Sequence, residues 1–251
     1  MRVLVVTAVP AERDAVTRAF GDGPGAVRTV PGAEVHRVDV PGPGGPGGSF
    51  VDVLAGGAGP AAAAAATAFG LAAGSGSGPA STPYDLVVSA GIGGGFAPVA
   101  PVGSLVVASG IVAADLGAQT PDGFLPVTAL GFGRDRHVPP ASLVRETAAA
   151  TGAHRGEILT VSTVTGDAER AAALRAAHPR AAAEAMEGFG VAEAADRAGV
   201  PVLEIRAVSN AVGPRDRDAW RIGDALAALT GAFGKLVPVL EGWTRHDRDH
   251  V

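Results

Sequence analysis

Apolar runs alternate along this chain with segments that carry helix signals. The fully apolar, β-branched run at 3–6 predicts a central strand, and the largely apolar run at 201–209 predicts another strand. Shorter apolar runs predict further strands at 35–40, 50–54, 86–89, 104–109 and 158–164. Helices are predicted at 11–20, 60–73, 141–151, 168–177 and 220–243. Strands that alternate with helices indicate one α/β domain, residues 1–251, with a mainly parallel sheet.

Glycine and proline interrupt this alternation at several places. The segments 41–49 and 74–83 are too rich in both residues for regular structure, so we expect flexible loops there. Pro238 predicts a bend or a break in the last helix. Residues 111–132 show no clear period, and so long an irregular segment is often functional. For 181–198, helix propensity alone favours one helix, whereas the alternation favours a short strand ending near Met186 and then a helix.

Composition restricts the classes of function. Hydrophobic residues make up 47% of the 251 residues and charged residues 18%, which indicates a globular protein with a large core. The net charge of −5 gives no support for binding nucleic acid. The absence of cysteine excludes disulfides, zinc–thiolate sites and a cysteine nucleophile. Early charges and interrupted apolar runs lead us to expect no signal peptide, no membrane helix and a cytoplasmic location.

A glycine-dense stretch follows the apolar strand at 86–89. Gly91, Gly93, Gly94 and Gly95 predict a turn between this strand and the one at 104–109. Glycine has no Cβ, so another group can approach its backbone closely. In open α/β sheets, ligands bind at the carboxyl ends of the strands. We therefore expect the floor of a ligand site here.

Cofactor and metal motifs are weak or missing. Residues 57–62, GAGPAA, resemble a dinucleotide-binding turn between a strand and a helix. The acidic residue that should follow at the next strand end is missing, because Asp85 precedes its strand. Close packing of helix on strand explains these glycines more simply. No P-loop, GxSxG or HExxH motif is present and the six histidines are scattered, so we expect neither cofactor nor metal.

Three polar residues follow predicted strands, and so belong to one edge of the sheet. Glu12 comes shortly after the first strand, Glu187 follows the strand that ends near Met186, and Asn210 ends the last strand. Each has a structural explanation by itself, as an acid in the first turn of a helix or as a helix cap. Because all three lie at strand ends, a shared site explains them better.

At this point the sequence resembles the nucleoside phosphorylase/nucleosidase superfamily over nearly its whole length. Six motifs carry the resemblance in order: the first strand with its turn to Glu12, then 56–59, 89–95, 101–107, 185–188 and 206–210. Within the superfamily, residues 113–118, 120–124 and 209–213 are most similar to nucleosidases that cleave futalosine. The resemblance implies a single-domain, three-layer α/β fold with a central, mostly parallel mixed sheet, and a homodimer or larger homo-oligomer.

The resemblance also implies roles for individual residues. Glu12 would activate a water molecule, Glu187 would hold the ribose hydroxyls, and Asn210 would bind the purine. Related methylthioadenosine nucleosidases have at this last position an aspartate that protonates the purine N7. The other implied substrate contacts are Gly57, Gly91, Ile92, Gly93, Met186 and Ser209, and Phe124, with Phe132 and Arg134, is a candidate for the benzoate end of futalosine.

The asparagine favours a 6-oxopurine over adenine. An amide donates to O6 and N7, whereas a carboxylate accepts from the amino group of adenine. Futalosine carries hypoxanthine, so the asparagine agrees with the reaction that the resemblance implies, which is hydrolysis of futalosine, with release of hypoxanthine, in the alternative menaquinone pathway. Glu12 beside the site would repel a phosphate dianion and activate water, although Arg13 is adjacent. A 6-oxopurine nucleoside phosphorylase, a methylthioadenosine-type nucleosidase and a non-enzymatic nucleoside-binding module remain alternatives.

Overall fold

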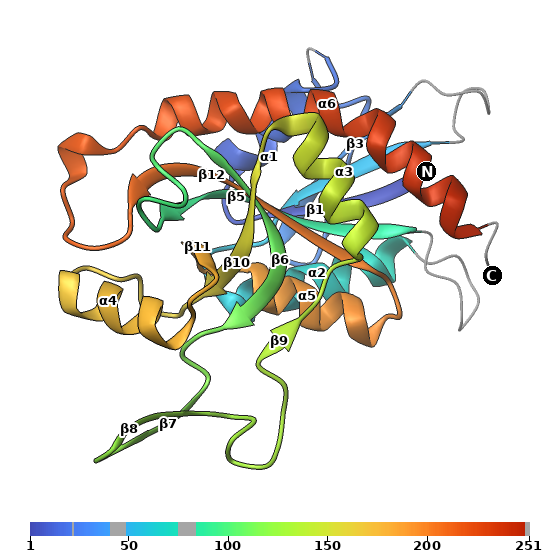
Figure 1. Ribbon diagram of the computed structural model, residues 1–251. Helices are drawn as coiled ribbons and strands as arrows, with labels where there is room; N and C mark the ends of the chain where they lie inside the picture. The colour runs from blue at the N-terminus through green and yellow to red at the C-terminus, as the bar shows by residue number, and fades with distance from the viewer. Residues whose placement is uncertain (22, 41–48, 75–83, 249–251) are drawn as a thin grey trace.

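The computed structural model describes residues 1–21, 23–40, 49–74 and 84–248 (Figure 1). The loops expected at 41–49 and 74–83 lie almost wholly outside these residues. The described strands of the main sheet are β1 (Arg2–Thr7), β2 (Ala26–Val30), β3 (Ala33–Asp39), β4 (Phe50–Ala55), β5 (Leu86–Gly95), β6 (Leu105–Ala113), β9 (Arg136–His137), β10 (His154–Thr160), β11 (Ala181–Ala185) and β12 (Val202–Ala211). A separate hairpin joins β7 (Gly117–Thr120) to β8 (Gly123–Pro126).

The main sheet has a parallel centre. The strand order is β11-β10-β6-β12-β5-β1-β4-β3-β2, in which β12, β5, β1 and β4 run parallel to one another. Three neighbouring pairs in this order are antiparallel: β4 with β3, β3 with β2, and β12 with β6. β11 also pairs with the far end of β5, so five strands close into a ring. The predicted α/β fold with a central mixed sheet is confirmed.

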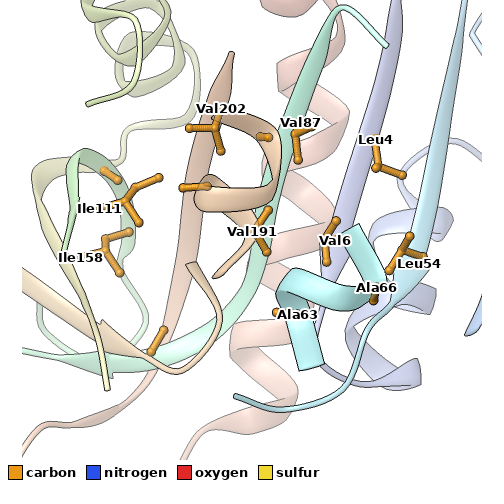
Figure 2. Packing of buried hydrophobic residues seen from close by; sticks show 14 of the residues in the cluster. Leu4, Val6, Leu54, Ala63, Ala66, Val87, Ile111, Ile158, Val191 and Val202 are labelled. Atoms are coloured by element: carbon orange, nitrogen blue, oxygen red, sulfur yellow. The ribbon is translucent and has the colours of Figure 1, made fainter. Parts of the chain in front are cut away.

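Helices cover both faces of the sheet. They are α1 (Pro10–Arg18), α2 (Pro60–Gly74), α3 (Ala141–Thr151), α4 (Ala168–Ala177), α5 (Gly188–Arg197) and α6 (Ile222–Arg248). Leu4 and Val6 of β1 pack with Ala63 of α2 and Val191 of α5, as Figure 2 shows. The alternate residues of β1 belong to a second cluster, with α1, α3 and α6. Burial on both faces explains why β1 is continuously apolar.

The glycine-dense stretch forms no turn, contrary to the prediction. β5 continues through Gly91 to Gly95 because its second half is still paired on both sides. β12 remains its partner on one side, and β11 replaces β1 on the other. A Cβ on Gly95 would lie 2.0 Å from the carbonyl oxygen of Ala100, and one on Gly93 would lie 2.7 Å from that of Glu184. The glycines therefore permit close packing of backbone within the sheet.

Several other boundaries differ from the predictions. Residues 111–132 are more regular than expected, since β6 runs to Ala113 and the β7–β8 hairpin follows. β2 was not predicted, and the strand expected at 158–164 is β10, four residues earlier. Residues 181–198 form a short strand and then a helix, as the alternation indicated. The helices at 141–151 and 168–177 are confirmed.

The last helix differs from expectation in two ways. α6 continues through Pro238 to Arg248, so the helix does not break there, and a bend at Pro238 stays a prediction. By length and composition, the segment Arg217–Trp243 is also apolar enough to cross a membrane, although the sequence reading expected no such segment. In the fold, Leu229, Phe233 and Leu236 of this helix are buried against the sheet. A core helix of a soluble protein passes the same test of apolar length.

A matched pair of glycine substitutions tests the contact between α2 and α5. A Cβ on Gly190 of α5 would lie 2.0 Å from the carbonyl oxygen of Pro60, the first residue of α2. We expect Gly190→Ala to lower the free energy of unfolding by about 1–3 kcal/mol, because overpacking forces the two helices apart. Gly231→Ala in α6, where nothing lies within 4 Å of the added Cβ, should instead raise it by about 0.5–1 kcal/mol. Urea unfolding measures both, and equal effects would contradict the prediction.

Candidate active site

A cavity of about 260 Å³ lies where β5, β11 and β12 end and where the chain leaves β1. Seven of the predicted site residues line it: Glu12, Ile92, Gly93, Met186, Glu187, Ser209 and Asn210. The structure therefore brings together, from four segments far apart in sequence, the three polar residues that strand ends had indicated and four residues that the resemblance implied. The cavity lies at the carboxyl ends of the parallel central strands, where α/β sheets bind ligands.

Glu12 is held by the backbone. It lies in the first turn of α1, just after β1, and is only 3% exposed. Its Oε2 accepts hydrogen bonds from the N–H groups of Ala8 (2.9 Å) and Val9 (3.3 Å), and its Oε1 accepts one from Ile92 (2.8 Å). Two carboxylate oxygens have about four acceptor positions, so acceptor capacity remains for a molecule in the cavity.

Glu187 joins the ends of two other elements. It follows β11 and precedes α5, and it is 5% exposed. Its Oε1 accepts from the N–H of Gly59 (3.2 Å), and its Oε2 lies 3.1 Å from Nη1 of Arg206. The positive φ of Gly59, 94°, is one that glycine adopts readily. The turn at 56–59 thus positions a carboxylate, a role that neither the weak dinucleotide motif nor close packing of helix on strand had indicated.

Arg206 of β12 connects the two sides of the site. Its side chain is 1% exposed; Nε donates to Oε1 of Glu204 (2.9 Å), Nη1 pairs with Glu187, and Nη2 donates to Oγ of Ser89 (3.1 Å). Burial lowers the pKa of Arg206, but Glu204, Glu187 and Glu12 outweigh burial and raise it. In the sequence, Arg206 was noted only as the first residue of the motif 206–210, and no role was predicted for it. The signal for it was present, because two charged residues lie two apart in an otherwise apolar strand.

Glu204 is the carboxyl group of this network that lacks full compensation. Burial raises its pKa to about 7; Arg206 opposes this, and Glu187 adds to it. One guanidinium cannot neutralise three neighbouring carboxylates. In the described part of the chain, Oε2 of Glu204 also has no hydrogen-bond partner. Glu204 therefore takes up a proton more readily than an exposed glutamate does.

Gly91 and Gly57 are not among the residues that line the cavity. A Cβ on Gly91 would lie 2.6 Å from Oε1 of Glu12 and 2.7 Å from Nη1 of Arg206. Gly91 is thus needed where the two charged side chains cross the strand. Gly57 has a φ of 94°, and its N–H donates to the carbonyl oxygen of Ala8. Direct contact of either glycine with a substrate stays a prediction.

Asn210 presents an oriented amide at the end of β12. Its Oδ1 accepts a hydrogen bond from the hydroxyl of Ser209 (2.8 Å), and its Nδ2 donates to the carbonyl oxygen of Ala211 (3.0 Å). One amide hydrogen is then left for a molecule in the cavity. The amide can therefore act as a hydrogen-bond donor toward a ligand.

The predicted contacts for a benzoate group lie elsewhere. Phe124 is in β8, is 43% exposed and is not among the lining residues, and Arg134 pairs with Asp196 (2.6 Å). The role given to Phe124 stays a prediction. The cavity has other walls that the sequence reading missed: Val164, Thr165, Glu184, Arg215 and Trp220. Of these, Arg215 lies with its guanidinium carbon 5.2 Å from the centre of the Trp220 ring.

Comparison with known proteins gives a consistent set of relatives. The family model described as "Phosphorylase superfamily" matches residues 2–237. A futalosine hydrolase from Streptomyces coelicolor is 65% identical over 99% of this chain and 100% of its own length. A futalosine hydrolase from Acidothermus cellulolyticus is 49% identical over 52% of this chain and 56% of its own.

Solved structures share the fold. The futalosine hydrolase of Helicobacter pylori aligns with a TM-score of 0.77 at 18% identity, over 95% of this chain and 97% of that one. A methylthioadenosine/S-adenosylhomocysteine nucleosidase from Colwellia psychrerythraea, in complex with adenine, aligns with a TM-score of 0.75 at 24% identity, over 96% and 95% of the two chains. At these identities the likeness shows the fold alone.

The raised pKa of Glu204 predicts a pH dependence of stability. Because its pKa is about 7 in the folded protein and 4.5 ordinarily, the folded state binds more protons between these values. The Glu204 contribution to the free energy of unfolding therefore falls as pH rises from about 4.5 to 7, by up to ~3 kcal/mol, and is constant above that window. Urea unfolding of the wild type and of Glu204→Gln at several pH values measures it. Parallel curves for the two proteins would contradict the assignment.

Proposed function

Because this chain belongs to the futalosine hydrolase family of the phosphorylase superfamily, we propose that it hydrolyses the N-glycosidic bond of futalosine and releases hypoxanthine. The observation that carries the proposal is the 65% identity to a futalosine hydrolase over almost the whole of both chains. The cavity adds a chemical reason, since it places two buried carboxylates and a donor amide around one space. The other product, dehypoxanthine futalosine, would enter the alternative menaquinone pathway.

Glu12 is the proposed general base. The bond between C1′ of the ribose and N9 of the base breaks, and its electron pair leaves with the base. The oxygen of a water molecule bonds to C1′ and gives its proton to the Glu12 carboxylate. Three backbone N–H groups hold the Glu12 carboxylate in place at the cavity wall. The Glu12 side chain is therefore already ordered before the reaction begins.

Glu187 is the proposed partner of the ribose. A carboxylate can accept hydrogen bonds from the 2′- and 3′-hydroxyls and can stabilise the positive charge that develops on the sugar. The N–H of Gly59 and the guanidinium of Arg206 fix its orientation. Arg206 is itself buried and bound on all three of its nitrogens, so the Glu187 carboxylate is held rigidly.

Asn210 is the proposed partner of the leaving base. The Ser209 hydroxyl donates to Oδ1, which directs the amide nitrogen as a donor. That nitrogen can donate to N7 or O6 of hypoxanthine and so stabilise the negative charge that the base gains on departure. This role agrees with a 6-oxopurine as the leaving group.

Hydrolysis is favoured over phosphorolysis by the pairing of the nearby arginines. Arg13, which the sequence left as a possible phosphate ligand, pairs with Asp14 and Glu34 and does not line the cavity. Arg206 is occupied by Glu187 and Glu204. A phosphate dianion beside Glu12 would thus meet a carboxylate, while Arg13 and Arg206 are already paired with carboxylates. The phosphorylase and methylthioadenosine nucleosidase alternatives are not favoured.

We further propose a homodimer or larger assembly in the cytoplasm. The support is the resemblance to the superfamily, together with apolar side chains that are exposed in and shortly after the β7–β8 hairpin, such as Phe124 (43%) and Phe132 (64%). Sedimentation velocity would measure the mass, and a monomer at micromolar concentration would contradict the assembly.

Removal of the proposed base should slow turnover. Glu12→Gln keeps the size of the side chain and loses the proton acceptor, so we expect kcat to fall about 10²–10⁴-fold while KM changes little. Hypoxanthine release from futalosine, with and without phosphate, is followed by chromatography. The matched control is Glu146→Gln on the exposed side of α3, which should leave turnover unchanged. Near-normal kcat in Glu12→Gln, or release that requires phosphate, would contradict the mechanism.

Asn210→Asp should change the preference for the base. A carboxylate accepts from the amino group of adenine and repels O6, so we expect the ratio of kcat/KM for futalosine to that for its 6-amino analogue to fall at least tenfold. Competition between the two nucleosides measures the ratio. An unchanged ratio would remove Asn210 from base recognition.

A further inference from the structure

Gly94 separates two polar side chains on one wall of the cavity. It is the register partner of Glu184 in β11 on one side and of Asn210 in β12 on the other. Register partners in a regular ladder project on the same face of a sheet, which places Glu184 on the Gly94 side. The register of β12 shifts between Val208 and Asn210, and there the contact gives the side: a Cβ on Gly94 would lie 3.4 Å from Nδ2 of Asn210. Gly94 has no side chain, so a gap about two strand spacings wide, roughly 9–10 Å, lies between a carboxylate and an amide.

Glu184 is a buried carboxylate with unused acceptor capacity. It is 5% exposed and lines the cavity. One oxygen accepts from the N–H of Thr165 (2.8 Å) and the other from its hydroxyl (2.5 Å). None of the ion pairs formed by the described residues involves Glu184. Holding Thr165 uses about half of the acceptor positions of a carboxylate, and the remaining positions require a donor from the cavity side.

The edge of a 6-oxopurine supplies this donor. Around hypoxanthine, N7 and O6 accept hydrogen bonds and N1–H, next to O6, donates one. In adenine N1 has no hydrogen and is itself an acceptor. A base lying over Gly94 with N7 and O6 toward the Asn210 amide turns N1 toward Glu184. A carboxylate accepts from N1–H and repels the N1 lone pair of adenine.

We propose that Glu184 is a specificity-determining residue that accepts the N1–H of the 6-oxopurine and rejects adenine. The inference rests on the proposed function, because it assigns the orientation of the base in that site. Glu184 and Asn210 then read opposite ends of one edge of the base, and Gly94 provides the space between them.

The wild-type protein provides the first test, without any substitution. Isothermal titration calorimetry compares hypoxanthine, 1-methylhypoxanthine, in which a methyl group replaces the N1 hydrogen, and adenine. A hydrogen bond to a charged group predicts that hypoxanthine binds about 10- to 100-fold more tightly than either of the others. Equal affinity for hypoxanthine and 1-methylhypoxanthine would overturn the inference.

Substitution of Glu184 is the second test. In Glu184→Gln the amide can donate to N1 of adenine, so the ratio of the dissociation constants of adenine and hypoxanthine should fall at least tenfold. Thr165→Val is the comparison, because it removes the hydroxyl that binds Glu184 and keeps the carboxylate; its ratio should stay close to that of the wild type. If Glu184 only holds Thr165, both variants weaken the two bases alike, and the inference is wrong.

The failure of the inference can be told apart from failure of the proposed function. Futalosine cleavage by the wild type tests the reaction and does not depend on how N1 is recognised. Cleavage of futalosine without discrimination at N1 overturns the role of Glu184 alone. Wild-type protein that neither cleaves futalosine nor binds hypoxanthine overturns both.

Discussion

The buried guanidinium of Arg206 is the interaction on which the site depends. It compensates the charge of Glu187 and Glu204 and lies close to Glu12. Without this cation, these carboxylates would be buried beside one another, and the desolvation and mutual repulsion would be prohibitive. Even with it, burial raises the pKa of Glu204 to about 7, because Arg206 offsets the burial only in part and Glu187 adds to the rise. Both oxygens of Glu187 therefore have partners, whereas Oε2 of Glu204 has no hydrogen-bond partner among the described residues.

The glycines of the chain make this network sterically possible. Gly91 leaves room for the tips of Glu12 and Arg206, and a Cβ on Gly188 would lie 2.2 Å from Oε2 of Glu204. Further along β5, the same absence of side chains lets β11 replace β1 as a neighbour and opens the space over Gly94. One glycine-rich strand therefore passes beneath the charged groups at one end and forms the floor of the cavity at the other.

Much of the architecture was predictable because local signals agreed with the fold. Pro139 and Pro140 before a helical run and Gly152 after it defined α3, whose last residue is followed by Gly152 in a left-handed conformation. The alternation of strands and helices also resolved 181–198 correctly against its helix propensity. The same reasoning failed at 91–95, because glycine favours turns locally, whereas pairing with β11 and β12 decides the conformation there.

The sequence by itself determined the α/β class, the superfamily and the three polar residues that lie together in the site. The succession of strands and helices along the chain, and the positions where strands end, follow from local patterns. Only the tertiary structure decided which charges meet. Arg206 and Glu204 look like two charges in a strand until β5, β11 and α5 enclose them, and Glu184 faces the cavity only because β11 crosses to the end of β5. The pairing of β11 with β5 joins Glu184 to Gly94, 90 positions earlier in the chain, and no local pattern encodes the burial that gives these side chains their chemistry.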